Sequence, residues 1–128
     1  MARILVIDDD VGGAELAATL TSAGHQVLKA NDAELGLALI KSQSPDLALV
    51  EVALPNGAQA GFGLLKRIKA HNPAIAVIIT SVAAASRQRV VLALRGGAQD
   101  FIEKPFRAQE VRQRVGAALA QQQTAWAY

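Results

Sequence analysis

Acidic, hydroxyl and basic side chains follow four apolar segments of the chain, at the point where each segment ends. These residues are Asp8-Asp9-Asp10, Glu51, Thr80-Ser81 and Lys104. Clustered carboxylates repel one another unless a cation lies among them, and oxygen ligands without His or Cys favour a hard cation such as Mg²⁺. A lysine and a threonine hydroxyl near that cation would suit the oxygens of a phosphoryl group. The pattern therefore predicts phosphoryl chemistry.

These residues can meet only if the segments before them are neighbouring parallel strands. We expect strands at 3–8, 26–30, 47–51, 75–80 and 100–102, and helices at 12–23, 33–43, 61–71, 86–95 and 107–121. Strands 3–8 and 75–80 are apolar on both faces, which is typical of a parallel sheet covered by helices on both sides. The (βα)₅ alternation indicates an α/β fold, in which ligands bind beyond the carboxyl ends of the strands.

The composition is that of a globular protein, with 52% hydrophobic and 19% charged residues in 128. We expect one domain at 1–120 and a short, frayed C-terminal tail at 121–128. The sequence contains no cysteine, which excludes disulfides and thiolate metal sites and favours a reducing cytoplasm. The apolar run 4–7 is too short for a signal peptide or a membrane span. We therefore expect a soluble, cytoplasmic protein.

Charge is distributed unevenly along the chain. Residues 1–60 carry three basic and eight acidic side chains, whereas residues 61–128 carry ten basic and three acidic ones. The basic half could bind an acidic partner, or its lysines and arginines could simply be solvated helix faces. We favour solvated faces over nucleic-acid binding, because no aromatic residues are interleaved to stack on bases.

Five segments of the chain resemble the response-regulator receiver family of the chemotaxis-regulator type. They are 4–10, 45–51, Leu54-Pro55, 77–80 and 97–106, and they occur in the family's order over about residues 2–118. The resemblance implies a flavodoxin-like, doubly wound parallel sheet with strand order 2-1-3-4-5. It also implies a role in two-component signal transduction and phosphorelay, as a signalling module rather than an enzyme.

The resemblance also implies a role for individual residues. Asp8 and Asp9, with residue 51, match the positions that hold Mg²⁺. Thr80 matches the hydroxyl that reaches the phosphoryl group, and Phe101 matches the switch aromatic that moves inward with it. Lys104 matches the lysine that pairs with phosphoryl oxygen, and Lys104–Pro105 matches the family's cis peptide bond.

Glu51 departs from the family, because an aspartate accepts the phosphoryl group at that position. An added methylene advances the carboxylate by about 1.5 Å, and a misplacement of about 1 Å can cost about a hundredfold in a positioned reaction. Glu51 would also crowd the Mg²⁺ site. We therefore expect a receiver that acts by protein–protein interaction without routine phosphorylation. Retained Mg²⁺-dependent phosphorylation by a histidine kinase is the alternative.

Two interpretations of Glu51 remain open. Its carboxylate could reach Lys104 and Thr80 and imitate a phosphoaspartate, or it could pair with Lys104 and fix one conformation without activating it. An inward Phe101 together with a Glu51–Lys104 contact would favour imitation. The resemblance places the partner surface on segments 86–95, 100–102 and 107–121, for a histidine kinase or a downstream effector. The oligomeric state is not decided by the sequence.

Several nearby residues have simpler interpretations. We expect Asp10 to cap the helix at 12–23, and Ser81 and Ser86 to cap or begin the helix at 86–95. Gly12-Gly13 lacks the spacing of a dinucleotide-binding loop. The loop 56–60 is two residues longer than is usual in the family, and we interpret it as a tolerant surface loop rather than a reshaped kinase-docking side.

Overall fold

A computed structural model describes residues 2–55, 57, 60–81 and 87–127. Their five strands form one parallel sheet in the order β2-β1-β3-β4-β5. The strands are β1 (Arg3–Ile7), β2 (Gln26–Ala30), β3 (Leu47–Glu51), β4 (Ala76–Ser81) and β5 (Asp100–Glu103). The predicted α/β class and strand order are confirmed.

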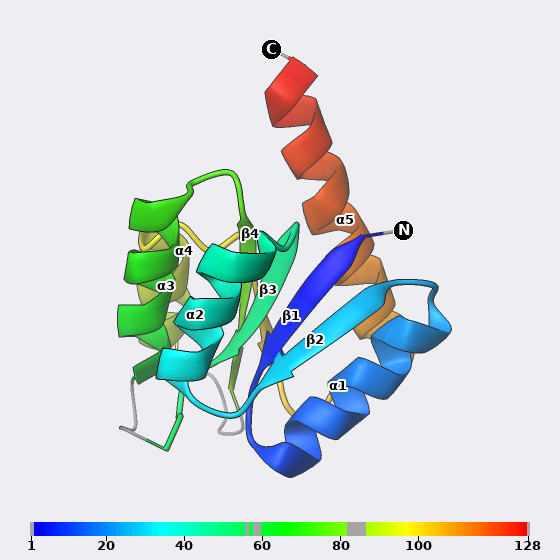
Figure 1. Cartoon of the computed structure of the whole chain (residues 1–128), viewed down its shortest axis with the longest axis horizontal. Helices are drawn as coiled ribbons and strands as arrows, with labels where there is room; N and C mark the ends of the chain where they lie inside the picture. Colours follow the sequence, from blue (N-terminus) through cyan, green and yellow to red (C-terminus); the bar gives the residue numbers. More distant parts are fainter. Residues whose placement is uncertain (1, 56, 58–59, 82–86, 128) are drawn as a thin grey trace.

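Helices cover both faces of this sheet, as the doubly apolar strands predicted. The helices are α1 (Asp10–Ser22), α2 (Ala33–Gln43), α3 (Ala60–His71), α4 (Arg87–Arg95) and α5 (Ala108–Ala127). Figure 1 shows α2, α3 and α4 on one face and α1 and α5 on the other. None of the helices within the described part of the chain is long and apolar enough to cross a membrane.

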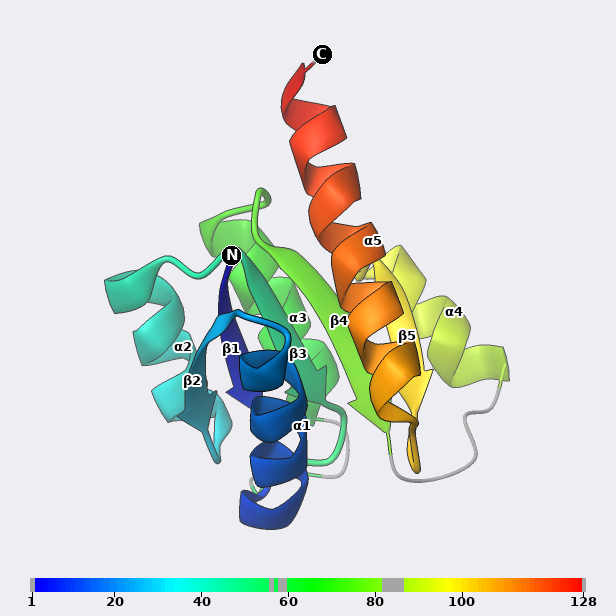
Figure 2. The same ribbon diagram turned by 90° about the vertical axis from the view of Figure 1, so that its right-hand side faces the viewer.

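Alternate residues of each strand enter two separate hydrophobic cores. Ile4, Leu49 and Ile78 pack with residues of α1 and α5. Leu5, Val50 and Ile79 pack with residues of α2, α3 and α4. This period of two places Asp8, Glu51 and Thr80 at the ends of rows that face α1 and α5. Figure 2 shows α5 lying along this face and continuing past the sheet.

Most element ends lie within two residues of the predictions, and two of the differences change the role of a predicted cap residue. Helix α1 starts at Asp10, and its N-cap is Asp9, whose carboxylate accepts a hydrogen bond from the Gly12 N–H; the prediction that Asp10 is the cap was wrong. Ser81 is the last residue of β4 and is buried, so it does not cap α4. Ser86 lies outside the described residues.

Helix α5 is longer than expected. It continues to Ala127 instead of ending at 121, because the Ala- and Gln-rich sequence after residue 116 contains good helix formers and no glycine or proline. The helix therefore includes most of the segment for which a frayed tail was expected. The division of the chain at residue 120 stays a prediction.

Candidate functional site

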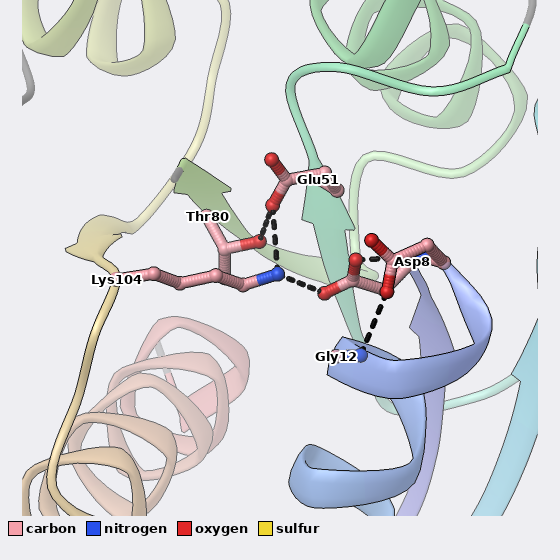
Figure 3. Close-up of polar contacts among 6 residues, drawn as sticks. Asp8, Gly12, Glu51, Thr80 and Lys104 are labelled. Atoms are coloured by element: carbon pink, nitrogen blue, oxygen red, sulfur yellow. Dashed lines mark hydrogen bonds and ion pairs between the residues drawn. The ribbon is translucent and has the colours of Figure 1, made fainter. Parts of the chain in front are cut away.

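The predicted residues meet at the carboxyl edge of the sheet. Glu51 and Thr80 are register partners at the ends of β3 and β4, Asp8 follows β1, and Lys104 follows β5. Figure 3 shows Lys104 reaching between the carboxylates of Glu51 and Asp8. The sheet alone thus assembles a cluster whose members are separated by up to 96 positions in the sequence.

Glu51 is the centre of this cluster. The Thr80 hydroxyl donates a hydrogen bond of 2.8 Å to Oε2 of Glu51, and Nζ of Lys104 lies 3.1 Å from the same oxygen. The Glu51 residue is only 3% exposed. Among the described residues, its second oxygen, Oε1, is buried and has no hydrogen-bond partner. One carboxylate oxygen is therefore held by two donors, while the other has none.

The surroundings of Glu51 act on its pKa in opposite directions. Burial raises the pKa of the carboxyl, and it outweighs the Thr80 hydrogen bond and the Lys104 charge, which lower the pKa. The nearby negative charge of Asp8 raises the pKa of Glu51 further. The ionised form of Glu51 is thus less favourable here than in water, although two donors support it.

Lys104 bridges two carboxylates. Its Nζ lies 2.5 Å from Oδ2 of Asp8 and 3.1 Å from Oε2 of Glu51, and the side chains of Asp8 and Lys104 are 1% and 12% exposed. Burial lowers the pKa of Lys104, but the Asp8 hydrogen bond and charge, followed by Glu51, raise it above its usual value overall. Lys104 is therefore held as a protonated ammonium between two acidic groups.

The three carboxylates predicted to hold Mg²⁺ are engaged elsewhere. Asp8 contacts Lys104 through Oδ2 and accepts the Asp9 N–H through Oδ1. Asp9 caps α1, and Glu51 contacts Thr80 and Lys104. Within the described ranges, no three His, Cys, Asp or Glu side chains are grouped so that they could hold a metal ion. In this arrangement Asp8, Asp9 and Glu51 do not form a ligand set for Mg²⁺.

Phe101 lies on the opposite face of the sheet from Thr80. It pairs in register with Ile79, is 8% exposed and belongs to the core formed with α2, α3 and α4. A buried, inward Phe101 and a Glu51–Lys104 contact therefore occur together, which is the combination that favours imitation. The Lys104–Pro105 peptide bond is cis, as predicted.

Two glycines of the site were not predicted from the sequence. A Cβ atom on Gly61 would lie 2.2 Å from the Glu51 carbonyl oxygen, so only glycine lets α3 approach the end of β3. A Cβ atom on Gly12 would lie 2.8 Å from Nζ of Lys104. The Gly12-Gly13 pair was visible in the sequence, but only the packing shows which of the two glycines faces the site.

The unusual loop after β3 is described only in part. Leu54 and Gly57 exchange two backbone hydrogen bonds, of 3.2 Å and 2.9 Å, and α3 begins at Ala60. The remaining loop positions 56, 58 and 59 lie outside the described residues. The interpretation of this loop as a tolerant surface segment stays a prediction.

Comparison with known proteins shows the family to which the chain belongs. A family model for response regulator receiver domains matches residues 4–116. The chain therefore belongs to the response regulator receiver family, and its role is in two-component signal transduction. Receiver domains are in general signalling proteins rather than enzymes; they interact with kinases or effectors and bind Mg²⁺ at the phosphoacceptor site.

Individual relatives include both single domains and larger regulators. The chain is 37% identical over 123 residues to protein PilH of Pseudomonas aeruginosa, covering 94% of this chain and 99% of PilH. It is 31% identical over 118 residues to the transcriptional regulatory protein PhoP of Escherichia coli, covering 91% of this chain but only 52% of PhoP. A CheY-like receiver domain crystal structure from Methanospirillum hungatei superposes with a TM-score of 0.88 at 28% identity, covering 98% of each chain.

Proposed function

We propose that this receiver signals by protein–protein interaction without phosphorylation at residue 51, because the Glu51 carboxylate makes the contacts that a phosphoryl group would otherwise make. The observation that carries the proposal is that Thr80 and Lys104 both contact Oε2 of Glu51, at 2.8 and 3.1 Å. These are the two residues that the family resemblance assigns to phosphoryl contact. The added methylene of glutamate brings the oxygen to them.

The position of Phe101 supports imitation of the phosphorylated state over simple locking. The resemblance associates an inward aromatic ring with a Thr hydroxyl drawn toward the phosphoryl group. In this chain Phe101 is buried while the Thr80 hydroxyl is bonded to Glu51. Both observations support imitation of the active form, with the Glu51 carboxyl group in place of a phosphoryl group that is added and removed.

A phosphorylation assay tests the first part of this proposal. The wild-type domain is incubated with acetyl phosphate and Mg²⁺ and analysed by intact mass spectrometry, beside Glu51→Asp and Glu51→Gln. We expect no phosphoryl group on the wild type or on Glu51→Gln, and a labile one on Glu51→Asp. A labile phosphoryl group on Glu51 itself would overturn the proposal in favour of a Mg²⁺-dependent phosphoacceptor.

The same variant supplies a reference for the active state. Amide NMR spectra of α4 and β5 are compared among the wild type, unmodified Glu51→Asp and phosphorylated Glu51→Asp. Imitation predicts that wild-type shifts, those of Phe101 included, lie closer to the phosphorylated variant. Shifts that instead match unmodified Glu51→Asp would show that Glu51 only locks an inactive conformation.

We further propose that the surface formed by α4, β5 and α5 binds the partner, a histidine kinase or a downstream effector. On α4, Val91, Leu92 and Leu94 are 38%, 50% and 49% exposed. Arg95, Arg107 and Arg112 are also exposed on α4, near the start of α5 and on α5. Apolar anchors beside arginines suit a partner surface that carries carboxylates. The absence of catalytic activity and a cytoplasmic location remain predictions.

A further inference from the structure

The ammonium of Lys104 occupies a place between carboxylates where a cation is needed. Asp8 and Glu51 are both almost fully buried, and each has one oxygen directed at Nζ, at 2.5 and 3.1 Å. Two such carboxylates repel each other in a dry site unless a positive charge separates them. Figure 3 shows that Lys104 supplies this charge from the side of β5.

Gly12 makes room for this ammonium. A Cβ atom at residue 12 would lie 2.8 Å from Nζ of Lys104 and 2.9 and 3.0 Å from the two carboxylate oxygens of Asp8. A side chain there would displace Nζ first, because its contact is the shortest and it ends the longer, more flexible side chain. Glycine inside a helix costs about 0.5–1 kcal/mol relative to alanine, and Gly12 lies within α1 without a left-handed backbone. A side chain at residue 12 is therefore excluded by lack of space and not by the backbone conformation.

A metal ion could reach the carboxylate site from solvent, so a blocked entrance would not be what excludes it. A pocket of about 400 Å³ lies beside the cluster and is lined by Asp8, Asp9, Gly13, Lys29, Asn31 and Leu35, among others. A hydrated divalent cation can therefore approach Asp8 and Asp9. What it would meet is an Asp8 oxygen already paired with Lys104, and an Asp9 oxygen that caps α1.

We propose that in this receiver the Lys104 ammonium is the resident cation of the carboxylate site, in place of a divalent metal, and that Gly12 is the positioning residue that admits it. This inference deepens the proposed function, because both place the Glu51 carboxylate on Lys104. It adds that the chain itself supplies the positive charge that lies between the two carboxylates. Mg²⁺ must then displace a bonded lysine before it can bind.

Magnesium titration tests the inference with four proteins: wild type, Lys104→Met, Gly12→Ala and Gly116→Ala. Thermal unfolding is followed with Mg²⁺ raised to about 10 mM, and binding is followed by calorimetry. A ligand that binds the folded state raises stability as RT ln(1 + [L]/Kd). We expect the wild-type Tm to shift by less than about 1 °C, and Lys104→Met to bind Mg²⁺ at least about tenfold more tightly.

Gly12→Ala provides the test that keeps every charge in place. Its methyl group should displace Nζ from Asp8, so Mg²⁺ should bind more tightly than to the wild type, and the ¹⁵Nζ resonance of Lys104 should move. Gly116→Ala, in α5, is the matched control, because it makes the same change within a helix and an added Cβ atom there meets no packing neighbour within 4 Å. It should leave both readouts at their wild-type values. This pair decides the question even if Lys104→Met does not fold.

Two results would overturn the inference: a wild-type affinity for Mg²⁺ equal to that of Lys104→Met, or identical behaviour of Gly12→Ala and Gly116→Ala. The experiments distinguish failure of this inference from failure of the proposed function. Tight Mg²⁺ binding by a wild-type domain that takes up no phosphoryl group removes only the resident-cation inference. A phosphoryl group on Glu51 of a domain that binds no Mg²⁺ removes only the proposed function.

Discussion

Glu51 and Thr80 end neighbouring parallel strands at the same register position, and the Thr80 hydroxyl donates a 2.8 Å hydrogen bond to the Glu51 carboxylate. The two side chains point the same way because strand residues at one register position share a face of the sheet. A carboxylate one methylene longer than aspartate thus meets the hydroxyl directly. The Glu51 side chain thus makes the contact with Thr80 that a phosphoryl group would make only while it is attached.

Thr80→Val should destabilise the domain while preserving its shape. The substitution removes the hydroxyl but retains the branched side chain, so the buried Glu51 carboxylate loses one of its two donors. Leaving a buried acceptor short of a partner costs about 1–3 kcal/mol. The free energy of unfolding in urea should fall by about that amount. Thr80→Ser keeps the hydroxyl and should lose clearly less; equal losses would show that packing, not the hydrogen bond, matters.

Stability should fall as pH rises through the pKa of Glu51. Burial raises that pKa above its ordinary value of 4.5, so the folded state binds the proton more tightly than the unfolded state. The stabilisation is fully present below pH 4.5 and is lost as pH rises through the folded-state pKa.

Glu51→Gln removes this titration, so the free energy of unfolding, measured from about pH 4 to pH 7, should lose that component of its pH dependence. Glu15→Gln, which removes an exposed carboxylate from α1, is the control variant for the change from Glu to Gln. The prediction fails if the wild type and Glu51→Gln have parallel stability profiles.

The sheet and the identity of the site residues could be predicted from the sequence because both follow from local patterns. Doubly apolar runs defined the strands, and the (βα)₅ alternation placed the residue after each strand on one edge. Asp8, Glu51, Thr80 and Lys104 were therefore named before their contacts were known. Their grouping depends on parallel strand pairing alone, which the pattern already contains.

The contacts within the site could not be predicted, because they depend on distances of an ångström or less. Asp9 and Asp10 are both good helix caps, and only the helix geometry selects Asp9. Similarly, Gly12 and Gly13 are alike as sequence, but only Gly12 lies against Lys104. The Asp8–Lys104 pair was also missed, since the resemblance assigned these two residues to different ligands, a metal ion and a phosphoryl group.

Gly61→Ala should destabilise the domain by displacing backbone. The new Cβ atom would lie 2.2 Å from the Glu51 carbonyl oxygen and 2.7 Å from Cα of Val52, and neither atom can move without shifting β3. Overpacking of this kind costs about 1–3 kcal/mol and occasionally more. Chemical denaturation should show that loss.

Gly63→Ala, two residues later in α3, is the matched control. Apart from the adjacent backbone of α3 itself, nothing lies within 4 Å of the place that its new methyl group would take, so helix propensity alone should act and stabilise by about 0.5–1 kcal/mol. Opposite signs for the two alanine variants are the expected result. A neutral Gly61→Ala would show that α3 can move away from the end of β3 without cost.

Asp8→Asn should lower the pKa of Glu51. The Asp8 charge raises that pKa, so its removal makes the ionised form of Glu51 easier to hold. Lys104 would then have a single charged partner, and its contact with Glu51 should tighten. The pH window in which stability is lost should move to lower pH than in the wild type. A carboxyl ¹³C titration of Glu51 by NMR measures the pKa directly.

Asp46→Asn is the control for this titration, because Asp46 bonds the Arg3 backbone N–H at the opposite edge of the sheet. It should leave the pKa of Glu51 unchanged. An unchanged pKa in Asp8→Asn as well would mean that Lys104 screens the two carboxylates from each other completely. A raised pKa would mean that Lys104 had left Glu51, so that the bridge depends on Asp8 to hold the lysine in place.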